Sequence, residues 1–303
     1  MKRLLFVFNP CSGKAKVRTH LYEIIEFFTD KDYLVTVYPT RACGDGYKCV
    51  KEMNGNYDLI VCSGGDGTLN ETVSGLLDSG KESPLGYIPF GSTNDFARSV
   101  GIPMELEAAM NISCCGKPFD IDVGCLNERY FVYVAGFGAF TNVSYSTPQK
   151  MKNSLGYLAY LLQGIKALSE LRAYDLVMEY DNGQVKGSFI VGLVMNSFSI
   201  GGFKNPAGDV TQLNDGLFEV ILIKSPQNII ELQAIIASLL SEKTNSENIV
   251  CIQTSKVNIV SEPMEWTVDG EYGGEYNAVT IYNKKRAVRI LVEEDNLKGN
   301  VRI

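Results

Sequence analysis

The densest group of chemistry-bearing residues in this 303-residue sequence is segment 63–71, SGGDGTLNE, where glycines surround Asp66. Because glycine has no Cβ, backbone N–H groups there can approach a polyphosphate closely. The Asp66 carboxylate can hold Mg²⁺ directly or through water. The alternative is a well-capped tight turn, with Thr68 as a helix N-cap and Glu71 as its capping-box partner. The glycines exceed what capping requires, so the segment favours phosphate binding.

Two further polar corners follow strand-like runs in the first third of the chain. Segment 9–14 (NPCSGK) precedes a helical pattern, where unpaired N–H groups and a positive dipole end can cradle phosphate. Lys14 would add a point charge, and a plain strand–helix turn is an equal alternative. Segment 89–96 (PFGSTNDF) places hydroxyls and the Asn94 amide at a helix start, where they can bind a nucleotide or orient the neighbouring corner. A simple N-cap with Asp95 in the first turn competes with that interpretation.

The fourth corner is segment 268–274 (VDGEYGG), at the end of a strand-like run far along the chain. Phosphoryl transfer to an alcohol requires a group that accepts the hydroxyl proton. The only histidine, His20, lies in a helical pattern, where a structural or surface role is favoured. Carboxylates must therefore perform acid–base chemistry, and Glu271 is the candidate base. The DGE triplet alone is a weak signal.

Composition removes several function classes. The formal charge of −7, from 28 basic and 35 acidic residues, argues against broad nucleic-acid binding and leaves only a local patch for anionic membrane. A single histidine excludes His-based zinc sites, Ser-His-Asp triads and HRD-type kinase loops. The sequence contains neither a GxxxxGK[ST] P-loop nor a strand-linked GxGxxG motif. Eight cysteines without a CxxC pair, a short first apolar run and no long apolar span predict a cytoplasmic protein with reduced thiols.

Hydrophobic patterning predicts two parts. The first alternates buried strands at 3–8, 33–38, 58–63 and 85–89 with helices at 16–30, 44–54 and 68–78, as in a parallel α/β sheet whose ligands bind at the carboxyl ends of the strands. The second part is rich in strands, predicting an antiparallel sandwich or barrel. Its expected strands are 119–126, 129–136, 174–181, 185–195, 217–223, 249–255, 256–261, 264–269 and 277–283. Asn182-Gly183 predicts a hairpin turn, helices are expected near 150–171 and 227–241, and run 287–292 is a candidate to return to the first part.

The segments NPCSGK, SGGDGTLNE, IPFGSTNDFAR and VDGEYGG, in that order and spacing, resemble the diacylglycerol kinase catalytic-domain family, closest to its soluble bacterial lipid kinases. GGDGT alone is shared with NAD kinases and phosphofructokinases, whereas the third corner and the late DGE are more specific. The resemblance covers nearly the whole chain. It implies a Rossmann-like, phosphofructokinase/NAD-kinase-like α/β domain at 1–120, completed by 286–303 if run 287–292 returns. It also implies an antiparallel β-sandwich domain at 121–285, with ATP bound between them.

The resemblance also implies roles for individual residues. Asp66 would organise the catalytic Mg²⁺ through water, Asp122 in the FDIDVG run would be a second acid of that network, and Glu271 would be the general base. A structural metal beside a DG turn would use Gln212, Asp215 and Leu217, and Asn214 in place of an aspartate should weaken that site. The residues expected to contact ATP are Asn9, Pro10, Cys11, Ser12, Gly13, Lys14, Thr40, Gly65, Asp66, Gly67, Thr68, Leu69, Asn70, Glu71 and Ser92. Among them, Lys14 would contribute a positive charge.

The expected activity is transfer of the γ-phosphoryl group of Mg·ATP to a lipid hydroxyl, with diacylglycerol favoured. Another lipid alcohol is the nearest alternative, and an NAD kinase-like metabolite kinase or a nucleotide-binding regulator without catalysis are more distant ones. The apolar segment 155–162, flanked by lysines, fits a membrane-facing helix, although core packing is favoured. The protein is expected in the cytoplasm, transiently at the inner face of the membrane, and a homodimer fits this kind of protein.

Overall fold

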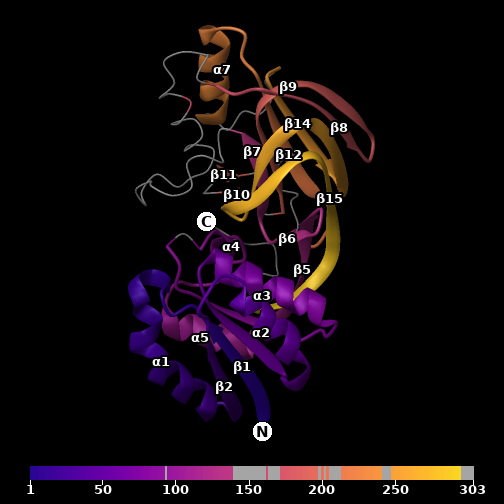
Figure 1. Cartoon of the computed structure of the whole chain (residues 1–303). Helices are drawn as coiled ribbons and strands as arrows, with labels where there is room; N and C mark the ends of the chain where they lie inside the picture. Colours follow the sequence, from indigo (N-terminus) through magenta and orange to yellow (C-terminus); the bar gives the residue numbers. More distant parts are fainter. Residues whose placement is uncertain are drawn as a thin grey trace. The chain divides into compact units, whose positions relative to one another are not determined.

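The computed structural model describes residues 1–92, 94–138, 162, 171–196, 199–200, 203–204, 213–240 and 247–294. The side chains of residues 14–16, 199, 200, 203, 204 and 240 also lie outside this description. The chain divides into two compact units, here called the N-terminal unit (1–121 with 286–303) and the C-terminal unit (122–285). It is a mixed α/β protein with an extensive antiparallel sheet (Figure 1). The expected helix near 150–171 falls outside the described residues, apart from the buried Leu162.

Parallel strands form the sheet of the N-terminal unit. Their order is β15-β4-β3-β1-β2, and the last segment of β15 joins through the pair Ile290 and Leu85. Strand β1 buries Leu4 to Val7 completely, which explains the continuous apolar run of its sequence. The strands are β1 (Lys2–Phe8), β2 (Tyr33–Pro39), β3 (Leu59–Gly64), β4 (Leu85–Pro89) and β15 (Glu271–Val292). Strands β1 to β4 lie within a residue of their expected bounds, whereas the expected runs 277–283 and 287–292 form the single strand β15.

Helices connect these strands, and two pairs of them pack together: α1 with α5 and α2 with α3 (Figure 1). Helix α1 begins at Ser12, earlier than predicted, because the turn closes directly after Pro10. The helix start expected at Asn94 and Asp95 is present as the short helix α4, whereas helix α5 was not predicted. The helices are α1 (Ser12–Asp30), α2 (Asp45–Met53), the 3₁₀ turn η1 (Asn54–Asn56), α3 (Asp66–Ser79), α4 (Asp95–Ser99) and α5 (Leu106–Cys115).

The C-terminal unit consists mainly of antiparallel strands. Strand β9 pairs with β7, β8 and β12, while β14 pairs with β7, β8 and β15. Helix α7 (Ile229–Leu240) is the predicted helix near 227–241. The strands are β5 (Lys117–Leu126), β6 (Arg129–Phe131), β7 (Val134–Gly138), β8 (Tyr174–Tyr180), β9 (Gly183–Met195), β10 (Ser199–Ile200), β11 (Phe203–Lys204), β12 (Phe218–Lys224), β13 (Ile249–Thr254) and β14 (Lys256–Val268).

Four expected strands of this unit have different bounds: one is divided, two are joined, and 277–283 is part of the longer strand β15. The run 129–136 is divided into β6 and β7, because Val132 and Tyr133 turn their N–H groups to the Asp269 carboxylate instead of a neighbouring strand. Runs 256–261 and 264–269 form the single strand β14, with a register irregularity between Val260 and Met264. The predicted hairpin near Asn182 is present, and Tyr180 pairs with Gly183 across it.

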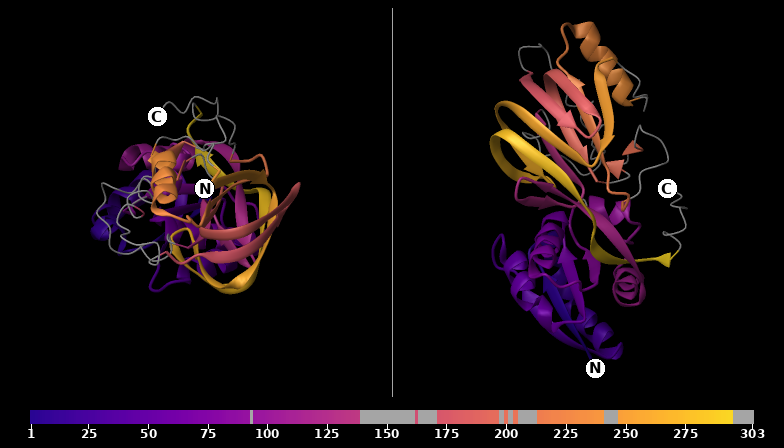
Figure 2. Two further views of the ribbon diagram at one scale, coloured as in Figure 1. Left: turned by 90° about the horizontal axis from the view of Figure 1, so that it is seen from above. Right: turned by 90° about the vertical axis from the view of Figure 1, so that its right-hand side faces the viewer.

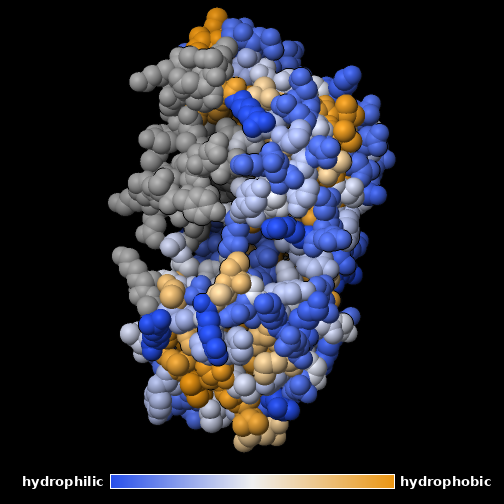
Figure 3. Space-filling model, in the orientation of Figure 1, coloured by the Kyte–Doolittle hydropathy of each residue, from blue (hydrophilic) through white to orange (hydrophobic). Residues whose placement is uncertain are grey.

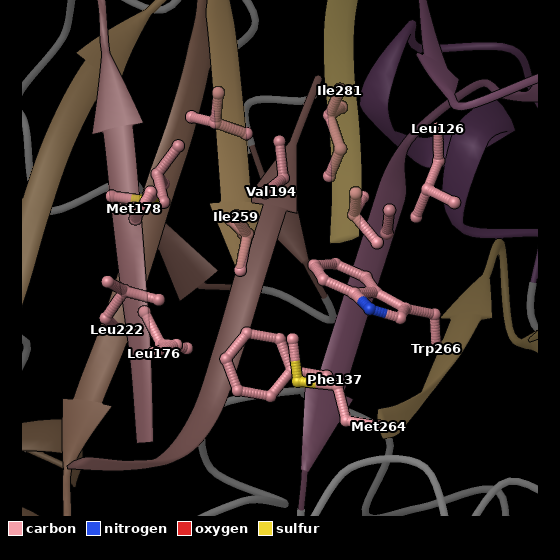
Figure 4. Close-up of a cluster of buried hydrophobic side chains, with 14 of the residues drawn as sticks. Leu126, Phe137, Leu176, Met178, Val194, Leu222, Ile259, Met264, Trp266 and Ile281 are labelled. Carbon is pink, nitrogen blue, oxygen red and sulfur yellow. The ribbon is translucent and has the colours of Figure 1, made fainter. Parts of the chain in front are cut away.

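Two hydrophobic clusters fill the C-terminal unit. One surrounds Trp266, whose ring lies edge-on to Phe137 with centroids 5.1 Å apart (Figure 4). The other packs Ile190, Leu193 and Ile221 against the apolar face of α7. Strand β12 and the second half of β9 (189–195) send side chains into both clusters, so these segments are almost continuously apolar.

The outer surface of the C-terminal unit is mainly hydrophilic in the view of Figure 3, with scattered hydrophobic residues. The strands of the C-terminal unit curve strongly in both views of Figure 2, as expected for twisted antiparallel sheets. Within the described part of the chain, none of the helices is both long and apolar enough to span a bilayer.

Candidate functional site

Strands β1, β2, β3 and β4 of the N-terminal unit end together at one edge of its sheet. Phe8 of β1 is in register with Pro39 of β2 and with Ser63 of β3, and Gly64 is in register with Pro89 of β4. The segments that follow these strands therefore start side by side. They contain Asn9, Thr40 and the first three glycine-rich corners, which therefore lie together at the carboxyl edge of the sheet.

The β1–α1 corner is a tight turn closed by Asn9. The Asn9 side-chain oxygen accepts the N–H of Cys11 at 2.9 Å, and its main-chain carbonyl accepts that of Ser12 at 3.1 Å. Gly13 has a φ of +57°, and a Cβ there would overlap the carbonyl oxygen of Phe90. This corner therefore packs directly on the β4–α4 corner, and only glycine allows that approach.

The β3–α3 corner is held by the carbonyl of Gly64. That oxygen accepts N–H groups from Phe90 at 2.8 Å and Gly91 at 3.0 Å, and the hydroxyl of Tyr87 at 3.2 Å. A Cβ on Gly91 would lie 2.5 Å from the Cα of Gly65. The glycines of the second and third corners are thus required for their mutual contact, beyond any role in ligand binding.

Asn94 organises the β4–α4 corner. It is buried, has a φ of +52°, and both accepts the N–H of Gly91 at 2.9 Å and donates to its carbonyl at 3.0 Å. Tyr87, on β4, donates a longer bond of 3.5 Å to the same Asn94 oxygen. The amide therefore shapes its own corner from within. Asn94 also stands at the N-cap position of α4, with Asp95 in the first turn and without a side-chain capping bond.

Asp66 is the first residue of α3, and its carboxylate faces the start of α4. Its two oxygens accept the N–H groups of Asp95 and Phe96, each at 3.3 Å. Burial raises the pKa of Asp66 above its ordinary value of 3.8, while these backbone N–H groups oppose the rise. A cation beside the carboxylate would relieve the burial penalty, because opposite charge favours the ionised form. The position is chemically suited to a hydrated Mg²⁺ that is shared with phosphate.

The predicted capping box at Thr68 and Glu71 is wrong. Helix α3 has Gly65 as its N-cap, and Thr68 is buried in the first turn. The Glu71 carboxylate instead accepts the N–H groups of Gly44 at 2.7 Å and Gly46 at 2.9 Å, at the start of α2. Helix α3 begins before Thr68, so Glu71 lies beyond the reach of its N-terminus. The Glu71 carboxylate instead faces the N-terminus of α2.

The remaining residues expected to contact nucleotide have mixed exposure. Cys11 and Ser92 are exposed, and Thr40 is half-buried with its N–H donated to Phe8 at 2.9 Å. Leu69 is buried, so only its backbone could face a ligand. The others are Pro10, Ser12, Gly67 and Asn70, all half-buried, and Lys14, whose side chain lies outside the description.

In the C-terminal unit, Glu271 is the exposed first residue of β15 and pairs with Val268 across a two-residue turn. The turn residues Asp269 and Gly270 have φ of +48° and +83°. A hairpin with left-handed residues at both central positions is the type that Asp-Gly favours. The DGE triplet is therefore a rigid hairpin tip that fixes where the Glu271 backbone begins.

Asp122 is fully buried, and its carboxylate accepts the N–H of Gly216 at 2.6 Å. Its own N–H donates to Leu213 at 2.7 Å, and the Asp215 carboxylate accepts from Leu217 at 2.8 Å. The structure thus brings Asp122 together with the Asn214-Asp215-Gly216 turn, which was expected only as a separate metal site. Gln212 lies outside the described residues, and among those described no cluster of three His, Cys, Asp or Glu side chains could hold a metal.

Three residues with organising contacts were missed from the sequence: Tyr87, Asp269, and Asn196, whose amide donates to the Asp122 carbonyl at 2.6 Å. Tyr87 and Asn196 carry no local motif that could have revealed them. Asp269 was visible in the DGE triplet, but only the fold shows that its carboxylate reaches residues 132–134.

The fold is that of solved bacterial proteins. A crystal structure of a diacylglycerol kinase from Bacillus anthracis str. Sterne matches with a TM-score of 0.75 at 21% identity, over 97% of this chain and 98% of that one. Another structure from the same organism reaches a TM-score of 0.81 at 22% identity, with the same coverage. These structures place the chain in a class of mixed α/β proteins.

Sequence comparison defines the family. Residues 3–126 match the diacylglycerol kinase catalytic domain. A diacylglycerol kinase of Bacillus subtilis (strain 168) is 38% identical over 278 residues, 90% of this chain and 91% of the relative. A diacylglycerol kinase of Staphylococcus aureus (strain MRSA252) is 33% identical over 97% of this chain and 93% of the relative. The chain belongs to the diacylglycerol kinase catalytic-domain family.

Proposed function

We propose that this chain transfers the γ-phosphoryl group of Mg·ATP to the hydroxyl of diacylglycerol, giving phosphatidic acid. One observation supports the proposal above all: three glycine-rich corners meet at the carboxyl edge of the parallel sheet, with the Asp66 carboxylate among them. Glycine corners and a helix start offer N–H groups to phosphate. Membership of a family whose compared relatives are named diacylglycerol kinases supports the acceptor.

In this proposal the N-terminal unit binds the nucleotide. The turn closed by Asn9, the glycines at 64–67 and Ser92 would contact phosphates or sugar, with Thr40 beside them. When bound, Mg²⁺ would neutralise charge on the phosphates. Asp66 would hold the hydrated ion, and its buried carboxylate fits this role because a single acidic group plus phosphate oxygens suffices for Mg²⁺. Glu71 would act indirectly, because its oxygens are engaged by Gly44 and Gly46.

The C-terminal unit would receive the acceptor lipid. Glu271, exposed at the hairpin tip, would accept the proton of the attacking hydroxyl, as transfer to an alcohol requires. Asp122 would complete the acidic network. We further propose that the unit is a β-sandwich domain over 121–285, and that 1–120 with 286–303 form a Rossmann-like nucleotide domain. Because the acceptor resides in a bilayer, the enzyme would work from the cytoplasm at the inner membrane face, alone or as a homodimer.

A divalent ion at the Asn214-Asp215-Gly216 turn is a separate proposal. Asp215 would be its acidic ligand, with the Leu217 carbonyl and Gln212 beside it. One Asp215 oxygen already accepts the Leu217 N–H, and the Leu217 carbonyl accepts Asn283 at 3.2 Å, so binding should be weak. Without nucleotide, millimolar Mg²⁺ should raise the melting temperature (Tm) of the wild type more than that of Asp215→Asn. An equal rise in both proteins would place the ion elsewhere.

A labelled-phosphate assay tests the acceptor class. The protein is incubated with γ-labelled Mg·ATP and mixed micelles that contain diacylglycerol, sphingoid base or monoacylglycerol, with NAD in a parallel tube. We expect label in phosphatidic acid. Label predominantly in another lipid alcohol would change the acceptor but keep the lipid kinase. Label only in NAD would refute the proposed function.

A further inference from the structure

The Asp269 carboxylate lies in a cradle of three consecutive backbone N–H groups. Its two oxygens accept from Val132 at 2.8 Å, Tyr133 at 3.0 Å and Val134 at 3.0 Å. The Asp269 N–H donates in return to the Val134 carbonyl at 2.8 Å, and the side chain is buried. Charge-assisted hydrogen bonds of this length are among the stronger polar contacts in proteins. The hairpin tip is therefore fixed to the β6–β7 connection at four points.

The turn type alone does not require this carboxylate. Type I′ hairpins form readily with either Asn-Gly or Asp-Gly at the central positions. An asparagine at 269 could adopt the same backbone, but its amide N–H₂ would oppose one of the three N–H donors. The second carboxylate oxygen of Asp269, which asparagine would lack, thus serves the contact with residues 132–134 and not the hairpin itself. That contact also divides the expected strand 129–136 into two.

The same connection leads to Asp122 through Asn196. The Asn196 amide donates to the Val132 carbonyl at 3.3 Å and to the Asp122 carbonyl at 2.6 Å, while its N–H donates to the Tyr133 carbonyl at 2.9 Å. All of these side chains are buried. Residues 132–134 therefore link the DGE hairpin to the strand that carries Asp122. Fully satisfied buried polar networks rigidify the groups that they connect.

We propose that Asp269 is a positioning residue for the phosphoryl-transfer reaction. Its carboxylate fixes the hairpin tip on residues 132–134, so that Glu271 is held in a constant place relative to Asp122. This inference rests on the proposed function, in which Glu271 is the base. Holding a base within a fraction of an ångström of its proton is worth a large factor in rate, because small misplacement of reacting groups can cost about 100-fold. Asp269 itself touches no substrate in this scheme.

The test compares Asp269→Asn with a matched control in the same unit, Asp181→Asn. Asp181 also sits in a hairpin turn and accepts two bonds, from the Ser255 N–H at 2.6 Å and hydroxyl at 2.8 Å, but it is exposed. Both full-length variants are assayed with Mg·ATP and diacylglycerol micelles. We expect Asp269→Asn to lose on the order of 100-fold in kcat with KM for ATP unchanged. Asp181→Asn should keep wild-type kcat and KM.

A double variant separates positioning from general loosening. If Asp269 acts through Glu271, Asp269→Asn combined with Glu271→Gln should be no slower than Glu271→Gln alone. Additive losses, or a wild-type kcat in Asp269→Asn, would overturn the inference. If Asp269→Asn fails to fold, as judged by near-ultraviolet circular dichroism, Asp269→Glu replaces it. A loss of about 10-fold or more in the kcat of Asp269→Glu supports the proposal. An unchanged kcat contradicts it. A wild type that labels no diacylglycerol would instead refute the proposed function.

Discussion

Replacing Glu71 with glutamine should destabilise the N-terminal unit in the absence of nucleotide. Both Glu71 oxygens accept N–H groups at the start of α2, from Gly44 at 2.7 Å and Gly46 at 2.9 Å. The contact is close, since a Cβ on Gly46 would lie 2.8 Å from one of these oxygens. Glutamine fits the space but replaces one acceptor with an N–H₂ donor and removes the negative charge.

The size of the effect follows from two contributions. A part-buried N–H without its acceptor costs roughly 1–3 kcal/mol. Loss of the charge at a helix N-terminus costs a further ~0.3–1 kcal/mol. The sum is about 2–3 kcal/mol at the centre of these ranges, which for a unit of this size lowers the Tm by roughly 6–12 °C.

Differential scanning calorimetry of the full chain without nucleotide measures this change. The fluorescence of Trp266, the only tryptophan, follows the C-terminal unit separately. Asp78→Asn is the matched control, because Asp78 also joins α3 to α2, through the Tyr47 hydroxyl at 2.7 Å, but at the exposed surface. Exposed polar pairs contribute little to the free energy of unfolding, so the Tm of Asp78→Asn should hardly differ from that of the wild type. If Glu71→Gln keeps the wild-type Tm and only raises KM for ATP, the carboxylate binds nucleotide and the reasoning is refuted.

Four other outcomes are expected. Glu271→Gln should bind ATP normally in equilibrium dialysis while kcat falls about 10²–10⁴-fold, and a near-normal kcat would mean that another group is the base. Asp66→Ala should be inactive at saturating ATP, and full recovery in excess Mg²⁺ would limit its role to affinity. Because burial raises the pKa of Asp66 above 3.8 in the folded chain, its ionised form costs stability as the pH rises through that raised pKa. The Tm of Asp66→Asn relative to that of wild type should therefore be higher at neutral pH than below pH 3.8, and a pH-independent difference would contradict this assignment. Gly91→Ala should lower the Tm, at a cost of about 1–3 kcal/mol, because its Cβ would meet Gly65 and the Asn94 side chain at 2.5 Å; an unchanged Tm would show that the corners can separate freely.

Local patterns in the sequence were sufficient for most elements of this protein. Buried parallel strands such as β1 and β3 read as short apolar runs between glycine corners, and their ends predicted where the polar residues gather. Helix α5 was missed, and of the short helix α4 only the start at Asn94 and Asp95 was predicted. Whether run 287–292 returned to the first part could not be read from the sequence, because a single parallel pair, Ile290 with Leu85, leaves no local signal.

Side-chain partners were less predictable than elements, because they depend on contacts between distant segments. The pattern of Thr68 and Glu71 matches a capping box, yet Glu71 contacts a glycine turn 27 residues away. The run 129–136 reads as one strand, and only the carboxylate of Asp269, 137 residues from Val132, explains its division. Such long-range polar contacts have no periodicity, so sequence reasoning identified the acidic residues but not what they bind.

The most direct test measures label transfer by wild type and Glu271→Gln side by side, with equal nucleotide occupancy verified beforehand. With γ-labelled Mg·ATP and diacylglycerol micelles, the wild type should accumulate labelled phosphatidic acid, while the variant should release about one-hundredth as much or less. Equal rates for the two proteins, or label that never enters lipid, would contradict the account.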